Sequence, residues 1–186
     1  KISKENYDMK ISSLLELPKL IENTLKIERD IQEASKDFSK AKGSMFLGRG
    51  YSFPIALEGA LKLKELAYVH AEGYPAGEMK HGPLALIENG MPVVVIAPRD
   101  EFYSKTISNM QEVISRGGKV LLISNKSTDE VSSENLWKKI QVETISDDLF
   151  PFLVTIPLQL LAYYAANALG YDIDKPRNLA KSVTVE

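Results

Sequence analysis

The sequence contains no cysteine among its 186 residues, and neither sign of charge dominates it. Without thiols, the chain can form no disulfide, no thiolate metal site and no cysteine nucleophile. Its 23 basic and 25 acidic side chains give a formal charge of -2. They leave no concentrated basic surface of the kind that binds a nucleic-acid backbone. These absences exclude disulfide scaffolds and thiol enzymes and count against nucleic acid as a partner.

Long hydrophobic runs are also scarce. The first nine residues alternate charge and polarity and lack the apolar core of a secretory signal peptide. The longest apolar stretch, Phe150 to Leu169, is interrupted by polar residues and a proline, whereas a membrane span needs roughly 20 predominantly apolar residues. We therefore expect a buried core helix there, no membrane association, and a cytoplasmic location.

After Gly43, short apolar runs alternate with longer helical patterns, which is typical of a parallel sheet built from strand-helix units. The predicted strands span residues 44–48, 69–73, 92–97, 119–124 and 139–143. The predicted helices span residues 54–68, a short segment near 81–87, 102–116 and 149–169. The pattern predicts an α/β three-layer sandwich with a five-stranded, mostly parallel sheet.

Apolar residues at helical spacing precede the sheet, from Leu14 to Phe38, and predict one or two amphipathic helices. Pro18 indicates either an irregular early turn or the start of the main helix. Two interpretations fit these helices about equally well. They could pack over the core, or they could link the domain to an upstream segment. We expect N-terminal helices within residues 1–43 that pack on the domain, a core over 44–171 and a C-terminal tail over 172–186.

In an open parallel sheet, ligands collect outside the carboxyl ends of the strands, so the loops that follow the strands are candidate sites. The first such loop, Gly48 to Pro54, has two glycines that allow a tight turn. Ser52 could cap the following helix, and exposed amides at the helix start could hold a phosphate. A plain tight turn fits equally well, so this loop indicates phosphate binding only weakly.

The predicted helix from Pro54 to Tyr68 is apolar around most of its circumference. It carries Glu58, Lys62 and Glu65 at i, i+4 and i+7, hence on one narrow stripe. One interpretation is a solvated face supported by a Glu58 to Lys62 pair, and spacing alone favours it. The other makes Glu65 a general base that is tuned by Lys62.

Both histidines of the chain lie in residues 70–84, a segment dense in glycine, proline and titratable side chains. Charged side chains there need partners, so the segment is expected to line a cleft or an interface. His81 fits a catalytic role and a structural cap equally, whereas His70 favours a core or strand position. Their separation matches no close-spaced metal-ligand motif, so we expect no metal site.

The tail, residues 172–186, has no helical or strand period before Val183, and composition alone predicts a disordered or loosely docked end. A lysine in this tail could form an imine with a carbonyl substrate if the tail folded over a site.

Four runs of residues are distinctive: Phe46–Gly50, Ala56–Glu65, Gly77–Leu86 and Pro176–Glu186. Together they closely resemble the glucosamine-6-phosphate synthase family, also called glutamine:fructose-6-phosphate aminotransferases (isomerising). The likeness runs from about Asn6 to the last residue and covers the second sugar isomerase (SIS) domain of the family. It implies a flavodoxin-like or Rossmann-like SIS fold.

The resemblance also implies an activity. In the family, a glutaminase with a cysteine nucleophile releases ammonia, and two SIS domains open fructose 6-phosphate, aminate it at C2 and isomerise it to glucosamine 6-phosphate. Glu65 matches the base that moves a proton between C1 and C2, and Lys62 matches a lysine near that base. His81 matches the ring-opening histidine, which the family supplies from the neighbouring subunit. Lys181 matches a candidate imine former in the tail, and Ala180 matches a backbone contact to the sugar.

Two parts of the family pattern are missing from the sequence: the glutaminase, and the first SIS domain with its phosphate-gripping loop. The resemblance implies a homodimer that works together with both missing parts and uses no cofactor. Without those parts, we expect the chain to be nearly inactive. A phosphosugar-sensing SIS module and a stand-alone phosphosugar isomerase or deaminase are the alternatives. The sequence shows no helix-turn-helix with a basic face, which counts against the sensing module. A stand-alone isomerase or deaminase is not expected to end in the tail sequence found here.

Overall fold

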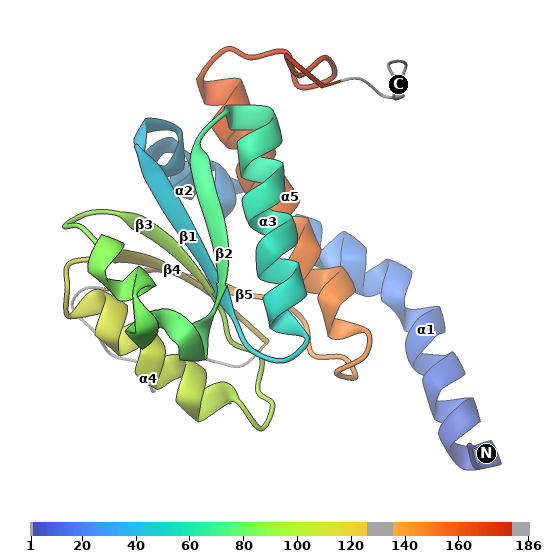
Figure 1. Ribbon diagram of the computed structural model, residues 1–186. Coiled ribbons are helices and arrows are strands. Elements are labelled where there is room, and N and C mark those ends of the chain that lie inside the picture. Colours follow the sequence, from blue (N-terminus) through green and yellow to red (C-terminus); the bar gives the residue numbers. More distant parts are fainter. Residues whose placement is uncertain (1, 126–135, 180–186) are drawn as a thin grey trace, which may run out of the picture.

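A five-stranded parallel sheet forms the centre of the protein in the computed structural model, which describes residues 2–125 and 136–179 (Figure 1). Its strands are β1 (Gly43–Gly48), β2 (His70–Pro75), β3 (Pro92–Ile96), β4 (Lys119–Ser124) and β5 (Leu136–Gln141). The strand order is β2-β1-β3-β4-β5. After β2 the chain crosses to the other side of β1 and adds the remaining strands there, as in flavodoxin-like sheets.

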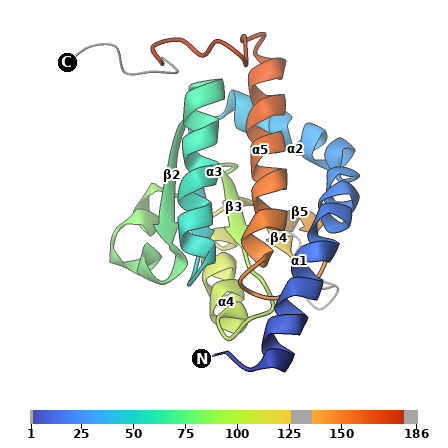
Figure 2. The same cartoon turned by 90° about the vertical axis from the view of Figure 1, so that its right-hand side faces the viewer.

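Helices cover both faces of this sheet (Figures 1 and 2). The helices on one face are α2 (Glu28–Lys40), α3 (Ser52–Ala67) and α5 (Phe150–Ala168), with α1 (Lys4–Leu25) packed on α5. The elements on the other face are α4 (Tyr103–Ile114) and the short 3-10 helices η1 (Ala76–His81) and η2 (Pro83–Leu86). The predicted three-layer α/β sandwich is confirmed.

The core consists of two apolar clusters, one on each face of the sheet. Successive strand residues point to opposite faces, so Phe46 packs with α3 and α5 while its neighbours Met45 and Leu47 pack with α4 and η1. All five residues of β3 are buried, which explains its unbroken apolar sequence. The sheet thus separates the elements of the two faces, even where these elements lie close together in sequence.

Several element boundaries differ by a few residues from those predicted, and two differences have a clear physical reason. α1 runs without interruption through Pro18. A proline has no N–H to donate to the carbonyl one turn earlier, but Pro18 is exposed, so that carbonyl can bond to water instead. β5 begins at Leu136 rather than near residue 139, because Trp137 packs against Phe38 and Lys138 pairs with acidic residues of α2. The first half of α1 projects beyond the body of the protein (Figure 1).

None of the helices in the described ranges combines the length and the apolar content that a bilayer crossing needs.

Gly48 ends β1 where the chain turns sharply into α3. A Cβ there would lie 2.3 Å from the backbone oxygen of Ser52, and backbone cannot yield as a flexible side chain can. We expect Gly48→Ala to lower the free energy of unfolding by about 2 kcal/mol or more. Gly43→Ala is the matched control, since its Cβ would meet only an ordinary 3.5 Å contact. Urea denaturation measures both, and equal stability of the two variants would contradict the close approach at Gly48.

Candidate functional site

Lys62 joins the two carboxylates of the stripe predicted on α3. Its Nζ lies 2.8 Å from Glu65 Oε2 and 3.6 Å from Glu58 Oε1. Only 29% of the Lys62 side chain and 28% of the Glu65 side chain are exposed, so this part of the stripe is not a fully solvated face. The hydrogen bond to Glu65 raises the pKa of Lys62, and the charge of Glu58 adds to this effect while partial burial opposes it. A lasting positive charge therefore stands beside the Glu65 carboxylate.

The Lys62 and Glu65 pair lies at the amino edge of the sheet. Both residues belong to the last turns of α3, which ends at Ala67, just before β2 begins at His70. Because α3 returns the chain from the carboxyl end of β1, its last turns lie beside the amino ends of the strands (Figure 1). This is the opposite edge from the one where ligands of parallel sheets were expected.

An open groove of about 380 Å³ adjoins the pair. Its walls come from α1, α3 and α5, and its lining residues are Leu25, Lys62, Leu66, Ile156, Gln159, Leu160 and Tyr163. Among the described residues that line it, Lys62 alone has a charged side chain. A molecule or domain seated in the groove would touch Lys62 and shield the ion pair from water.

His81 is the last residue of η1 and lies on the other face of the sheet from α3. Its Nδ1 is 2.7 Å from Glu78 Oε2, and 73% of the His81 side chain is exposed. η1 follows the carboxyl end of β2, whereas Glu65 lies near the amino end of the same strand. A single chain therefore does not bring His81 and Glu65 into one site.

The tail is docked at the same end of α3 as Glu65. The backbone N–H of Arg177 donates a hydrogen bond of 2.7 Å to the hydroxyl of Tyr68, and the Arg177 guanidinium lies 4.1 Å from the centre of the Tyr68 ring. Tyr171 packs on the same ring, with centroids 4.8 Å apart. Ala180 and Lys181 lie outside the described residues. The segment that leads to them is held beside the Glu65 end of α3.

Tyr68 was not singled out by sequence reasoning. It caps α3 in the left-handed conformation, with φ 56°, and this conformation is uncommon outside glycine and asparagine. No pattern in the sequence marks a tyrosine for this backbone or for contact with a segment so distant along the chain.

His70 opens β2 but is exposed, with its Nε2 3.2 Å from Glu72 Oε1. The strand position predicted for it is confirmed, and the core position is wrong, because the edge strand β2 leaves its first side chain in solvent. Tyr74 also donates a hydrogen bond to Glu72, which lowers the pKa of that carboxyl. Within residues 2–125 and 136–179, no group of three or more acidic or histidine side chains is arranged to hold a metal ion.

The loop after β1 does not resemble a phosphate site. Ser52 is buried and is the first helical residue of α3, so it does not cap the helix as expected. The neighbouring pocket carries three carboxylates and is lined by Gly50, Tyr51, Asp100, Glu101, Phe102 and Asp147. Burial raises the pKa of Asp100, although a hydrogen bond from the Phe102 amide opposes this shift. Carboxylates at this position would repel an anionic ligand.

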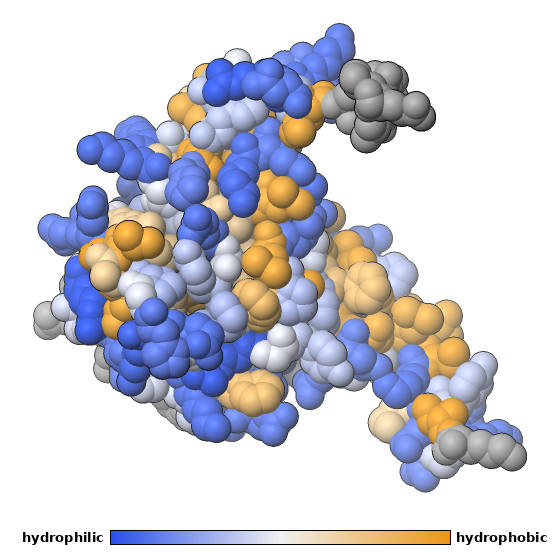
Figure 3. All heavy atoms as spheres, viewed as in Figure 1, coloured by the Kyte–Doolittle hydropathy of each residue, from blue (hydrophilic) through white to orange (hydrophobic). Residues whose placement is uncertain are grey.

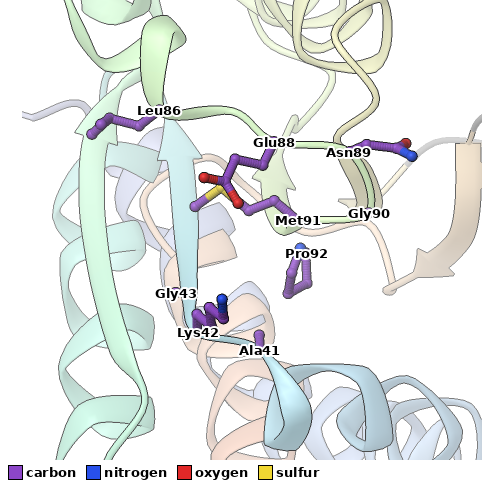
Figure 4. Close-up of a pocket in the computed structure, with 9 residues that line it drawn as sticks. All are labelled: Ala41, Lys42, Gly43, Leu86, Glu88, Asn89, Gly90, Met91 and Pro92. Carbon is purple, nitrogen blue, oxygen red and sulfur yellow. The ribbon is translucent and has the colours of Figure 1, made fainter.

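Another pocket, of about 340 Å³, lies at the amino ends of β1 and β3 (Figure 4). It is formed by the connection between α2 and β1 and by the loop that leads into β3. Its lining includes none of Lys62, Glu65 and His81. The residues predicted to act on a substrate are therefore not collected in this pocket.

The curated proteins that the chain matches include two close relatives of the same name. The chain is 50% identical over 186 residues to a glutamine-fructose-6-phosphate aminotransferase (isomerizing) of Rhizobium meliloti, covering all of this chain and 31% of the relative. It is 51% identical over 176 residues to the protein of the same name from Brucella abortus, covering 95% of this chain and 29% of that relative. The chain thus spans about a third of the length of the curated relatives that it matches.

Solved structures agree in fold. The C-terminal domain of glucosamine-fructose-6-phosphate aminotransferase from Francisella tularensis superimposes with a TM-score of 0.89 at 43% identity, covering 94% of this chain and 49% of that one. Glucosamine-6-phosphate deaminase from Thermotoga maritima gives a TM-score of 0.70 at 28% identity, over 90% of this chain and 48% of that one. The SIS domain family matches residues 37–169, from the end of α2 through α5. On this match, and on the parallel sheet order that accompanies it, the chain belongs to the SIS domain family.

Proposed function

We propose that this chain is the second SIS domain of an isomerising glutamine:fructose-6-phosphate aminotransferase. In that role it contributes to the conversion of fructose 6-phosphate and glutamine into glucosamine 6-phosphate for amino-sugar synthesis. The half-buried Glu65 carboxylate, hydrogen-bonded to the charged Lys62 beside an open groove, carries the proposal. The relatives of about 50% identity support it. The proton transfers of this reaction need only side chains, so we propose no cofactor.

Glu65 is the general base of the isomerisation. Converting the C2 imine formed by amination into the amino aldose moves one proton from C1 to C2, and a carboxylate on one side of the sugar can take it and return it. Lys62 holds that carboxylate in one orientation through their 2.8 Å hydrogen bond. Its positive charge also lies where it can stabilise negative charge that develops on the substrate.

His81 opens the sugar ring. Opening requires one proton on the ring oxygen and the loss of another from the anomeric hydroxyl, and imidazole suits both transfers because it titrates near neutrality. The exposed position of His81, on the face opposite Glu65, supports its action in the site of a second copy. We therefore assign a homodimer in which each site combines residues of both chains.

The tail completes the sugar site. Lys181 is the candidate imine former, whose amine adds to the C2 carbonyl carbon with loss of water, and the Ala180 backbone contacts the sugar. The docking of Arg177 on Tyr68 supports this placement, because it leads the tail to the Glu65 end of α3. In this arrangement, residues 1–43 form packing helices, 44–171 the core and 172–186 the part of the tail that serves the site.

The remaining partners are the first SIS domain and the glutaminase of a longer polypeptide. Apolar side chains on α1, among them Ile11, Leu14 and Leu15, are exposed, and Figure 3 shows apolar atoms along this helix and beside it over the body. The first SIS domain would cover this surface and grip the sugar phosphate, which the acidic pocket after β1 does not favour. The absence of cysteine, and hence of disulfides, fits a cytoplasmic location.

Activity of this chain alone, compared with the chain preceded by the segments present in its relatives, tests the proposal. We expect no glucosamine 6-phosphate from this chain with fructose 6-phosphate and glutamine, and steady production from the longer polypeptide. The longer polypeptide carrying Glu65→Gln is the negative control. Conversion of fructose 6-phosphate by this chain alone, either to an aldose 6-phosphate without ammonia or to glucosamine 6-phosphate with added ammonium, would assign a stand-alone isomerase or deaminase instead. Sugar-phosphate binding without turnover by the longer polypeptide would indicate a sensing module.

A further inference from the structure

We propose that Arg49 is a positioning residue, which fixes η1 on α4 and thereby sets where His81 stands. The inference rests on the ring-opening role proposed above for His81. It assigns a task to a cation that lies in the loop after β1 and has no part in the Lys62 and Glu65 pair.

The Arg49 side chain is gripped from α4. Its Nη2 donates a hydrogen bond of 2.9 Å to Asn109 Oδ1, and its Nε donates one of 3.3 Å to the same oxygen. Asn109 is buried, with 7% of its surface exposed. The acceptor is therefore held by the core, and two donors of one planar group fix the direction of the guanidinium.

The gripped guanidinium lies directly against η1. A Cβ on Gly77 would stand only 2.7 Å from Arg49 Nη2 and 3.0 Å from its Cζ, so the glycine allows the close approach. η1 also contacts α4 directly. Lys80 pairs with Glu112 of α4 at 3.0 Å, and Met79 is buried in the apolar cluster to which α4 contributes.

Asn109 and Glu112 stand one turn apart on α4, so the two ties to η1 are adjacent. Asn109 acts through Arg49, and Glu112 acts on the residue just before His81. Because η1 has only six residues, Ala76–His81, a shift at Gly77 is transmitted to its last residue. His81, which is proposed to act in the site of a second copy, thus lies on a segment that two contacts with α4 hold in place.

Arg49 stands in the loop that binds ligands in many doubly wound sheets. Here its donors point to Asn109, and the adjoining pocket carries the carboxylates of Asp100, Glu101 and Asp147. The loop therefore supports the element that carries His81 rather than holding a substrate anion.

The test uses Arg49→Lys in the longer polypeptide. A lysine keeps the charge but cannot place two planar donors on Asn109 while packing flat on Gly77. We expect kcat with fructose 6-phosphate to fall about 10-fold or more, since small misplacements of catalytic groups have effects of this size. KM is expected to change less than about 3-fold, because Arg49 does not touch the sugar. Arg99→Lys, at an exposed arginine in another loop, is the matched control.

A second substrate separates positioning from general loss of structure. 5-Deoxyfructose 6-phosphate lacks the hydroxyl that closes the ring, so it needs no ring opening. Arg49→Lys and His81→Ala are both expected to turn it over within about 2-fold of the unsubstituted protein. Gly77→Ala, whose Cβ would displace the guanidinium, should reproduce the Arg49→Lys pattern, with Gly43→Ala as its control.

The outcomes distinguish the inference from the function on which it rests. Equal losses of Arg49→Lys on both substrates, or unchanged kcat on fructose 6-phosphate, would overturn the positioning role. Equal losses of His81→Ala on both substrates would overturn the ring-opening role and the inference with it. Neither result would change the role proposed for Glu65, which the Glu65→Gln variant tests separately.

Discussion

Glu65→Gln is expected to lower the rate of isomerisation by about 10²-fold to 10⁴-fold, the range that general base catalysis usually contributes. Glutamine keeps the size of the side chain and an acceptor for the hydrogen bond of 2.8 Å from Lys62, but it cannot take a proton from C1. Glutamine hydrolysis by the longer polypeptide should continue, because the ammonia-releasing reaction does not use this residue. Ammonia release and glucosamine 6-phosphate formation, measured together, give the two rates.

Solvent deuterium sharpens this test. A base that moves a proton from C1 to C2 exchanges some of it with water, so deuterium should enter C2 of glucosamine 6-phosphate with the unsubstituted protein and not with Glu65→Gln. Glu58→Gln is the matched control, since Glu58 also faces Lys62 but at 3.6 Å. We expect it to keep isomerisation within about 3-fold. Wild-type rates in Glu65→Gln, or equal losses in both variants, would remove Glu65 from the role of base.

The stripe that contains Glu65 could be predicted from the sequence because it depends only on helical spacing. Residues at i, i+3 and i+4 face one another on any α-helix, so the contacts of Lys62 with Glu58 and Glu65 follow once the helix is assigned. The sheet was predictable for a similar reason, since unbroken apolar runs such as Pro92–Ile96 arise where both faces of a strand are covered. Local periodicity carries this part of the structure.

The placement of the site could not be predicted in the same way. The rule for parallel sheets directs attention to the carboxyl ends of strands, and Arg49 and Asp100 do lie there, but they serve packing and an acidic pocket. Glu65 lies at the opposite edge because it stands on the returning helix. Contacts such as Arg49 with Asn109 and Arg177 with Tyr68 join residues far apart in sequence. No spacing rule marks such pairs before the chain is folded.

The separation of His81 from Glu65 predicts complementation between inactive variants. Suppose that each site takes Glu65 from one chain and His81 from its partner. A dimer of one Glu65→Gln chain and one His81→Ala chain then has one site with both defects and one site with none. Random mixing makes about half of the dimers mixed, so about a quarter of the wild-type activity should return.

The matched control for this experiment mixes Glu65→Gln with Lys62→Met. These two residues lie on the same helix, 2.8 Å apart, so every site built from either chain keeps one defect and no activity should return. Subunit exchange is verified with chains that carry different tags, purified in tandem. Recovery in the first mixture alone would place His81 across the dimer. If purified mixed dimers show no recovery, each site must take both residues from one chain, which would require a rearrangement of η1 around the edge of the sheet.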